Sequence, residues 1–228
     1  MTDQIVPYRE PVTLLGGGAA EASLLHEALG LAPVLIAADG GANMAVAEGL
    51  TPDLVIGDFD SVTEETLAAI PAERQLRVPE QETTDFEKCL SRIVAPFVLG
   101  VGFMGARADH TLAVWNALIR HRDRRCILIG SEDVAFAAPN QLTLPLEPGT
   151  RVSLFPMAAV SGTSRGLRWP IDGIDFAPWG RVGTSNEALG ALELAFSGPG
   201  MLVILPKACL GLVIAHLRQT ARPCVRGG

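Results

Sequence analysis

The sequence has few of the features that mark zinc-binding, secreted or membrane proteins. Its four cysteines, at positions 89, 126, 209 and 224, include no C-x-x-C pair, which argues against a zinc or redox motif and predicts reduced, buried thiols. The first ten residues contain no apolar stretch of the kind a signal peptide needs. The richest apolar runs, 31–38 and 93–106, are too short or too interrupted by Pro and Gly to cross a bilayer. We therefore expect a cytoplasmic protein with no membrane segment.

Basic residues are also too scarce for a protein that binds polyanions. Lys and Arg number 18 against 25 Asp and Glu, and the net charge of -7 opposes nonspecific binding to nucleic acid or anionic lipid. Small phosphorylated ligands stay compatible with this charge, because a metal ion and backbone N–H groups supply positive charge locally. A hydrophobic fraction of 48% and a charged fraction of 19% indicate a compact globular chain.

The first half of the chain alternates short β-branched runs with segments of helical composition. Strands are predicted at 12–15, 34–38, 54–56, within 97–103 and at 126–129, and helices at 19–29, 41–48, 64–70, from about 84, and at 110–121. This alternation predicts an α/β fold over residues 1–140, with a mostly parallel, Rossmann-like sheet and helices on both faces.

The pattern changes after about residue 139. Short strand-like runs separated by Pro, Gly, Ser and Asn are predicted at 141–144, 151–155, 166–169, 192–196 and 201–205, before a helix at about 209–218. Residues 141–228 are therefore predicted to form a smaller C-terminal antiparallel β-sandwich.

Asp39 is the first residue that points to chemistry. It stands where the predicted strand 34–38 opens into a loop, and Gly40 and Gly41 would let the backbone approach a ligand before the next helix. The alternative is that Asp39 only caps that helix.

Asp58 and Asp60 follow the predicted strand 54–56. In extended backbone alternate side chains point the same way, so both carboxylates would face one cation. The alternative is an ordinary turn with solvated Asp residues.

Two further loops combine charged residues with a helix start. Thr84 is the predicted N-cap of a helix on which Asp85 and Lys88 are i, i+3 neighbours, suited to a metal and a phosphate or simply to a helix ion pair. Arg107 follows the strand within 97–103 and precedes a helix, where it could hold phosphate as a bidentate donor.

These loops should converge, because all follow strands of one parallel sheet. Two carboxylates about 5 Å apart repel by roughly 3 kcal/mol at a dielectric of about 20, so the acidic loops favour a bound cation. Oxygen ligands favour Mg²⁺ over zinc, and Mg²⁺ is typical of phosphate transfer. A G-x-x-x-x-G-K-[ST] phosphate loop is absent from the sequence.

Four motifs, in this order and spacing, resemble thiamine pyrophosphokinase. They are DGGAN at 39–43, GDFDS at 57–61, TDFEKCL at 84–90 and GARADHTLA at 105–113; GLRWP at 166–170 and TSNE at 184–187 resemble the C-terminal domain of that family. The resemblance spans roughly residues 34–205. The chain departs mildly from the family pattern, with Glu82 in place of an Asp, Ala106 in place of a Gly and Val114 in place of an Asn common in bacterial members.

The resemblance implies Mg²⁺-dependent transfer of the pyrophosphoryl group of ATP to the hydroxyl of thiamine, giving thiamine pyrophosphate and AMP. It also implies a catalytic domain of residues 1–140 that binds ATP and Mg²⁺, and a thiamine-binding, dimerisation domain of residues 141–228. Family members are homodimers with active sites at the interface.

Carried over by position, the metal ligands are Asp58, Asp60 and Asp85, and these three with Asp39 form the catalytic carboxylates; Asp85 or Asp39 would accept the hydroxyl proton. The residues implied to surround ATP are Asn43, Ser61, Gln81, Lys88, Arg107, Asp109 and His110. Ser185 and Asn186 would contact thiamine. Trp169 is a candidate stacking face for the thiamine rings, as is Trp179, and the alternative for both is a place in the sandwich core.

Two other functions fit part of the sequence. A metal-dependent glycosyltransferase also uses an Asp-x-Asp pair, such as Asp58 and Asp60, to hold a nucleotide-sugar diphosphate, but this leaves the other motifs unexplained. A non-enzymatic nucleotide-binding regulator is the third interpretation.

Overall fold

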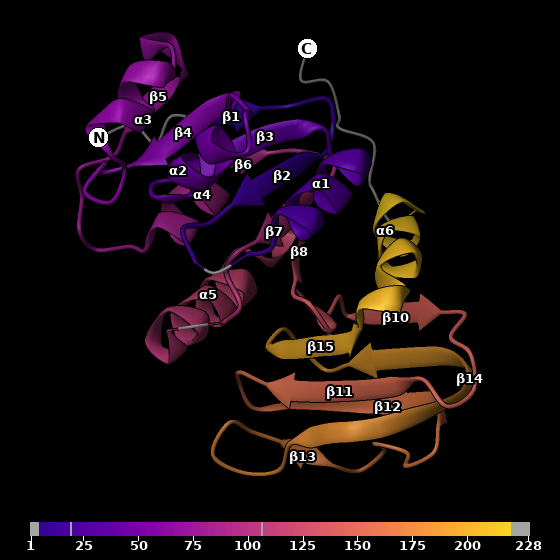
Figure 1. Cartoon of the computed structure of the whole chain (residues 1–228). Helices are drawn as coiled ribbons and strands as arrows, with labels where there is room; N and C mark the ends of the chain where they lie inside the picture. Colours follow the sequence, from indigo (N-terminus) through magenta and orange to yellow (C-terminus); the bar gives the residue numbers. More distant parts are fainter. Residues whose placement is uncertain (1–4, 19, 106, 220–228) are drawn as a thin grey trace, which may run out of the picture.

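A mixed β-sheet runs through the whole molecule (Figure 1). The computed structural model describes residues 5–18, 20–105 and 107–219. One half of the sheet is parallel, in the order β5-β4-β3-β2-β7-β8. These strands are β2 (Val12–Leu15), β3 (Val34–Ala38), β4 (Leu54–Gly57), β5 (Gln75–Arg77), β7 (Val98–Val101) and β8 (Cys126–Ile129).

Helices cover both faces of this parallel half. The helices are α1 (Ala22–Leu31), α2 (Gly41–Ala47), α3 (Glu64–Ala69), α4 (Asp85–Arg92) and α5 (Ala108–Arg120). Neighbouring residues of β2 show the two layers, because Leu15 belongs to the core cluster that contains Leu25 of α1, whereas Leu14 belongs to the one that contains Leu90 of α4 and Leu118 of α5. The predicted α/β architecture is thereby confirmed. A separate short sheet joins β1 (Val6–Pro7) to β6 (Ile93–Val94).

The sheet continues into the second half of the chain without a break. Strand β9 (Asp133–Ala137) pairs antiparallel with β8 and, along its other edge, with β15 (Met201–Pro206). The order then runs through β11 (Arg151–Pro156), β14 (Gly183–Phe196), β12 (Val160–Leu167) and β13 (Asp175–Phe176), with β10 (Gln141–Leu144) also on β14 and helix α6 (Leu210–Gln219) against β10.

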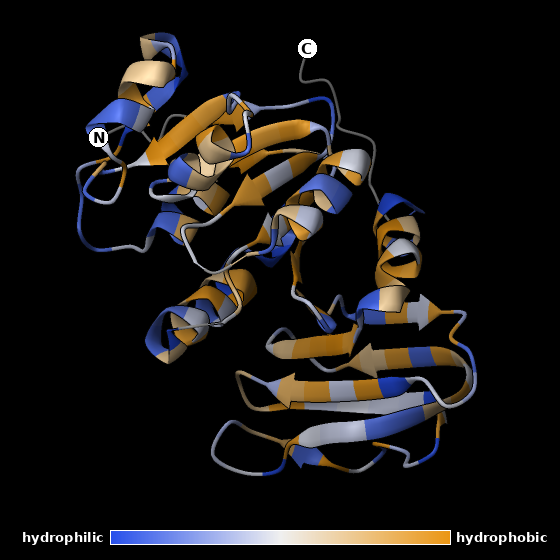
Figure 2. Ribbon diagram, in the orientation of Figure 1, coloured by the Kyte–Doolittle hydropathy of each residue, from blue (hydrophilic) through white to orange (hydrophobic). Residues whose placement is uncertain are grey.

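Strand β14 is long enough to take part in two pairings. Its residues 183–187 pair with β11, whereas its later residues pair with β10 and β12, so the antiparallel strands turn around a common core. Figure 2 shows apolar residues along the strands of both halves. Leu144, Leu154 and Leu192 belong to the same core cluster as Leu15 and Leu99 of the parallel half.

Several strands of the structure differ from the prediction. The strand predicted at 166–169 lies earlier, as β12 over Val160–Leu167, and the strand predicted at 192–196 is only the end of β14. Strand β9 was not predicted, and neither were the short strands β1, β5, β6 and β13. The first parts of β12 and β14 are rich in Ser, Thr, Gly and Asn and partly exposed, so they lack the apolar signal on which a strand prediction depends.

None of the described helices is both long and apolar enough for a membrane span. Cys89, Cys126 and Cys209 are free and buried, as predicted, and Cys224 lies outside the described residues.

Candidate active site

A cleft of about 700 Å³ opens at the carboxyl ends of the parallel strands. It reaches across β2 and β7, which are neighbours in the sheet. The chain continues from β2 to β3 in one direction along the sheet and from β7 to β8 in the other, and open α/β sheets bind ligands at such a point. The lining includes ten of the residues predicted for catalysis, metal or ATP: Asp39, Asn43, Asp58, Asp60, Ser61, Gln81, Asp85, Lys88, Arg107 and His110.

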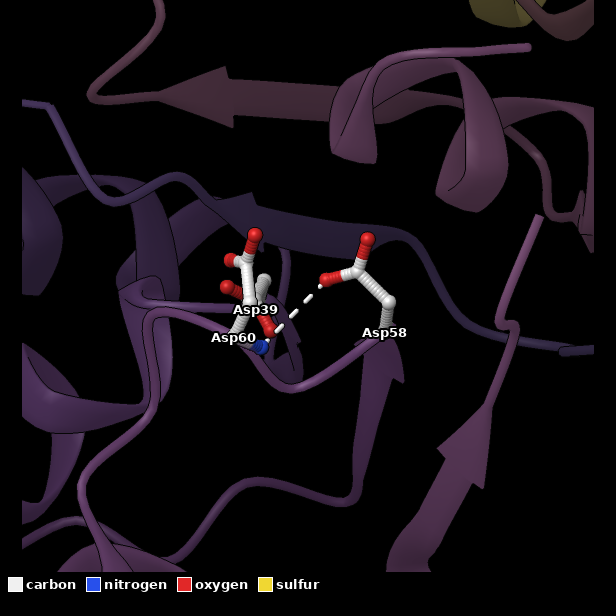
Figure 3. A group of neighbouring side chains, drawn as sticks. All are labelled: Asp39, Asp58 and Asp60. Carbon is white, nitrogen blue, oxygen red and sulfur yellow. Dashed lines mark hydrogen bonds between the residues drawn. The ribbon is translucent and has the colours of Figure 1, made fainter. Parts of the chain in front are cut away.

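Three carboxylates form a compact group in this cleft. One oxygen of each of Asp39, Asp58 and Asp60 lies within 4.8 Å of the others (Figure 3). Asp85 lines the same cleft and joins the group through an ion pair with Lys88. Carboxylate oxygens at this spacing could hold a hard divalent cation.

Asp39 is held by the loop that carries the other two carboxylates. It is 1% exposed, and its two oxygens accept the backbone N–H groups of Phe59 at 2.9 Å and Ser61 at 3.0 Å. Its side chain therefore does not cap α2, whose N-cap is Gly40 without a side-chain cap bond. Burial raises the pKa of Asp39 above its ordinary value, and the nearby charge of Asp85 adds to the rise.

The glycines of these motifs serve close packing of the loops. A side chain at Gly57 would collide with Asp39, since an added Cβ would lie 2.7 Å from the Asp39 Cβ. At Gly41 an added Cβ would lie 2.2 Å from the backbone oxygen of Leu15. The absence of a side chain at Gly41 therefore allows the first turn of α2 to pack against the end of β2. The prediction for Gly41 was a close approach of its backbone to a ligand.

Asp58 and Asp60 meet through a turn, so the prediction of an extended backbone between them was wrong. Phe59 has a φ of 69°, in the left-handed region, and the Asp60 N–H donates to Asp58 Oδ1 at 3.3 Å. The two N–H groups that Asp39 receives hold this turn in place. The carboxylates are brought together by a local turn and not by the alternation of a strand.

Lys88 lies between two of the acidic groups. Its ammonium is 2.9 Å from Asp58 Oδ2 and 3.2 Å from Asp85 Oδ1, and the residue is 2% exposed. Gln81 donates to the same Asp58 oxygen at 2.7 Å. Asp58 is therefore not a solvated turn residue, and Lys88 does more than form an ion pair with Asp85 along the helix, so both alternative interpretations of these residues are excluded.

The pKa shifts follow from this network. Burial alone would raise the pKa of Asp58, but the hydrogen bonds from Lys88 and Gln81 outweigh it and the pKa is lowered. Burial tends to lower the pKa of Lys88, and its bonds to Asp58 and Asp85 raise it more. Burial raises the pKa of Asp85, against the opposing effect of Lys88. Lys88 is therefore charged and offsets part of the repulsion among the carboxylates.

Asn43 and Ser61 connect two of the loops. The Asn43 side chain donates to the Ser61 backbone oxygen at 2.9 Å and accepts the Thr63 N–H at 3.0 Å. The Ser61 hydroxyl donates to Asp60 Oδ1 at 2.8 Å. The first turn of α2 is thus tied to the loop after β4.

Arg107 stands on the rim of the cleft at the N-cap of α5. Its guanidinium binds Asp109 in a bidentate pair, with bonds of 2.7 and 3.3 Å, and both side chains are largely exposed. The hydrogen bond from Arg107 lowers the pKa of Asp109 to about 2. Asp109 is not among the residues that line the cleft, so it contacts the cleft through Arg107. Ala106, the departure from the family motif, lies outside the described residues.

The residues predicted to contact thiamine lie together on the second half of the chain, apart from this cleft. Asn186 accepts the Trp169 N–H at 3.2 Å and donates to the Trp169 oxygen at 2.7 Å. Ser185 next to it has a φ of 61°. Trp169 is 55% exposed and Trp179 82%, so neither belongs to the core. The Arg168 guanidinium lies over the Trp169 ring, 5.1 Å from its centroid.

Comparison with known proteins finds a family model that matches the region of the cleft. A model described as thiamin pyrophosphokinase, catalytic domain, matches residues 25–129, which include all four motif loops of the cleft. Residues 25–129 are thus similar to the catalytic domain of thiamin pyrophosphokinases.

Relatives extend this match beyond the catalytic region. Thiamine pyrophosphokinase 1 of Oryza sativa subsp. japonica is 28% identical over 186 residues, 66% of this chain and 70% of the relative. Thiamine pyrophosphokinase 1 of Arabidopsis thaliana is 26% identical over 190 residues, 68% of this chain and 71% of the relative. The solved thiamin pyrophosphokinase of Candida albicans has the same fold, with a TM-score of 0.71 over 90% of this chain and 97% of that one at 16% identity.

Proposed function

We infer that the protein is a thiamine diphosphokinase, which transfers the pyrophosphoryl group of ATP to the hydroxyl of thiamine and releases AMP. The observation that carries this inference is the meeting of the family's motif loops in one cleft, with three carboxylates, a buried lysine and an arginine. A glycosyltransferase would use only the Asp-x-Asp pair, and a regulator would need no such set of charged groups. The family relatives favour the kinase over both.

The donor set of the cleft fits Mg²⁺. Asp58, Asp60 and Asp85 would hold the ion, because oxygen ligands suit Mg²⁺ and Asp85 keeps an oxygen outside its bond to Lys88. Asp39 has both oxygens engaged by the loop and would serve mainly to shape it. When bound, the ion would neutralise charge on the phosphate oxygens of ATP.

The remaining residues would position ATP and stabilise the reacting phosphates. The thiamine hydroxyl attacks the β-phosphorus, the bond to the α-phosphate oxygen breaks, and AMP leaves. Lys88 and Arg107 would stabilise the negative charge on the phosphates, and Asn43, Ser61, Gln81 and His110 would complete the ATP site, with Asp109 orienting Arg107. Asp85 or Asp39 would accept the hydroxyl proton; within the protein Asp85 has one oxygen bound, to Lys88, whereas both Asp39 oxygens accept N–H groups.

We further propose that residues 1–140 bind ATP and Mg²⁺ and that the β-sandwich of residues 141–228 binds thiamine in a homodimer. Trp169, Ser185 and Asn186 do not line the cleft of their own chain, which supports a site completed by a second copy. A mixture of two inactive variants, Asp60→Asn and Asn186→Ala, should regain activity through mixed dimers with one intact site. An inactive mixture of proteins that exchange subunits would contradict the shared site.

The experiment that tests the function is a product assay. Purified protein with ATP, Mg²⁺ and thiamine should form AMP and thiamine pyrophosphate in equal amounts, and omission of thiamine or chelation of the metal should stop AMP formation. ADP as the main product, or AMP formed at the same rate without thiamine, would rule the function out.

A further inference from the structure

Glu80 closes a tight turn between β5 and α4. Its Oε2 accepts the backbone N–H groups of Glu82 at 2.7 Å and of Thr83 at 3.0 Å, and its Oε1 accepts the Thr83 hydroxyl. One half-buried carboxylate therefore receives three hydrogen bonds from two residues, Glu82 and Thr83. Bonds to a carboxylate are stronger than those between neutral groups, so this turn is well defined.

The turn and the helix that follows it each carry a group that contacts Asp58. Gln81 lies inside the turn and donates to Asp58 Oδ2 at 2.7 Å. Thr84 follows the turn and caps α4 by accepting the Glu87 N–H. One helical turn later Lys88 reaches the same Asp58 oxygen at 2.9 Å. The conformation of the turn thus sets how Gln81 and α4 approach the acidic group.

Glu80 itself is not among the residues that line the cleft. Burial would raise its pKa, but the hydrogen bonds from Thr83 and Glu82 outweigh burial and lower it, so the carboxylate is ionised at neutral pH and accepts all three bonds.

We propose that Glu80 is a positioning residue of the active site, whose carboxylate fixes the turn that places Gln81 on Asp58 and starts the helix bearing Asp85 and Lys88. It acts by accepting hydrogen bonds, and its charge is not needed at the reacting atoms. The part that concerns turnover rests on the proposed function, whereas the part that concerns the turn does not.

Two substitutions separate hydrogen bonding from charge. Glu80→Ala removes every acceptor. Glu80→Gln removes the charge but keeps the shape, because its carbonyl can accept both N–H groups while its amide donates to the Thr83 hydroxyl. Glu73→Ala is the matched control, since Glu73 is exposed in the short helix η1 (Ala72–Arg74) and truncation there removes the same atoms and charge. Glu80→Met, which keeps the length without an acceptor, replaces the alanine variant if that chain does not fold.

Two measurements are made on each variant at a temperature where near-UV circular dichroism shows native packing. Hydrogen exchange reports the Glu82 and Thr83 amides in the protein without substrates, and steady-state kinetics report kcat and the KM values for ATP and thiamine. In Glu80→Ala the two amides should exchange at least about tenfold faster, and kcat should fall by about 10–100-fold, the usual cost of small misplacement in an active site, with the KM for thiamine little changed. Glu80→Gln should stay within about threefold of wild type in both, the remaining loss being that of neutral in place of charge-assisted bonds.

Three outcomes would overturn the proposal. The first is unchanged exchange of the two amides in Glu80→Ala, which would mean that Glu80 does not hold the turn. The second is faster exchange with kcat equal to that of Glu73→Ala, which would mean that the turn does not position the site. The third is an equal loss of kcat in Glu80→Gln and Glu80→Ala, which would make the charge decisive. Wild-type protein that fails to form AMP would refute the proposed function alone, because the exchange result does not depend on it.

Discussion

Substitution of Asp60 by Asn should have opposite effects on stability with and without metal. Asp60 is exposed, belongs to the group of three carboxylates, and accepts a hydrogen bond from the Ser61 hydroxyl, which an Asn oxygen can also accept. Without metal, the substitution therefore removes a repelling charge and leaves no buried donor unpaired.

The size of the effect follows from the spacing of the oxygens. Two charges within 4.8 Å repel by about 3 kcal/mol at a dielectric of about 20 and by about 1 kcal/mol in water. The exposure of Asp60 and the ammonium of Lys88 both reduce this, so Asp60→Asn should raise the free energy of unfolding by about 0–1 kcal/mol. For a chain of this size that is a rise in Tm of up to about 4 °C.

With Mg²⁺ and ATP bound, wild type should be the more stable of the two proteins. Wild type gains about 2.7 kcal/mol from a ligand present at about 100 times its Kd. A tenfold weaker site in the variant would gain only about 1.4 kcal/mol from the same concentration. The variant should also lose most of its turnover, because a neutral amide is a poorer ligand for Mg²⁺ than a carboxylate.

Thermal melting of both proteins, in chelator and in saturating Mg²⁺ with ATP, measures these differences. Equal ligand-induced shifts in Tm for variant and wild type would remove Asp60 from the site. A loss of about 0.5–2 kcal/mol in chelator would instead show that Asp60 supports the loop as a structural group.

Two further substitutions test the neighbouring groups. Asp39→Asn should lower the free energy of unfolding of the metal-free protein by about 1–3 kcal/mol, as measured by urea denaturation. The reason is that one amide oxygen cannot accept both the Phe59 and Ser61 N–H groups, and the buried amide nitrogen then faces a donor. A rise in the free energy of unfolding like that expected for Asp60→Asn would show that repulsion dominates at Asp39 as well. Arg107→Ala should raise the pKa of Asp109 from about 2 toward 3.8, followed by carboxyl-carbon NMR titration, and a pKa that stays near 2 would mean that another group holds the charge.

Five of the six parallel strands could be predicted from the sequence because their signals are local, whereas the short polar strand β5 gave none. The central strands are buried on both faces and read as short apolar runs, and Thr84 precedes α4 with the chemistry of an N-cap. The early part of β14 gives no such signal. It is polar, and it is a strand because it pairs with β11, whose paired residues lie 29 to 36 positions earlier.

The candidate site was predictable in its members but not in its contacts. The motif positions predicted that the carboxylates lie at one edge of the sheet. Their hydrogen-bond partners could not be predicted, because the partners of Asp39 are 20 and 22 residues away in the sequence and Lys88 is 30 residues from Asp58. The bonds of Asp39 depend on a left-handed turn at Phe59, a residue type that gives no warning of it. The role of Glu80 depends on main-chain donors, which no side-chain pattern shows.

The unbroken sheet limits how the site can close. Backbone hydrogen bonds join β9 to β8 on one edge and to β15 on the other, so the antiparallel half is attached to the parallel half by a ladder instead of a hinge. Swinging Trp169 and Asn186 over the cleft of their own chain would require that ladder to part, and each backbone group exposed would need a new partner. Access of thiamine should therefore be controlled by loop and side-chain movements or by adjustment between whole subunits, and a hinged closure within one chain is not expected.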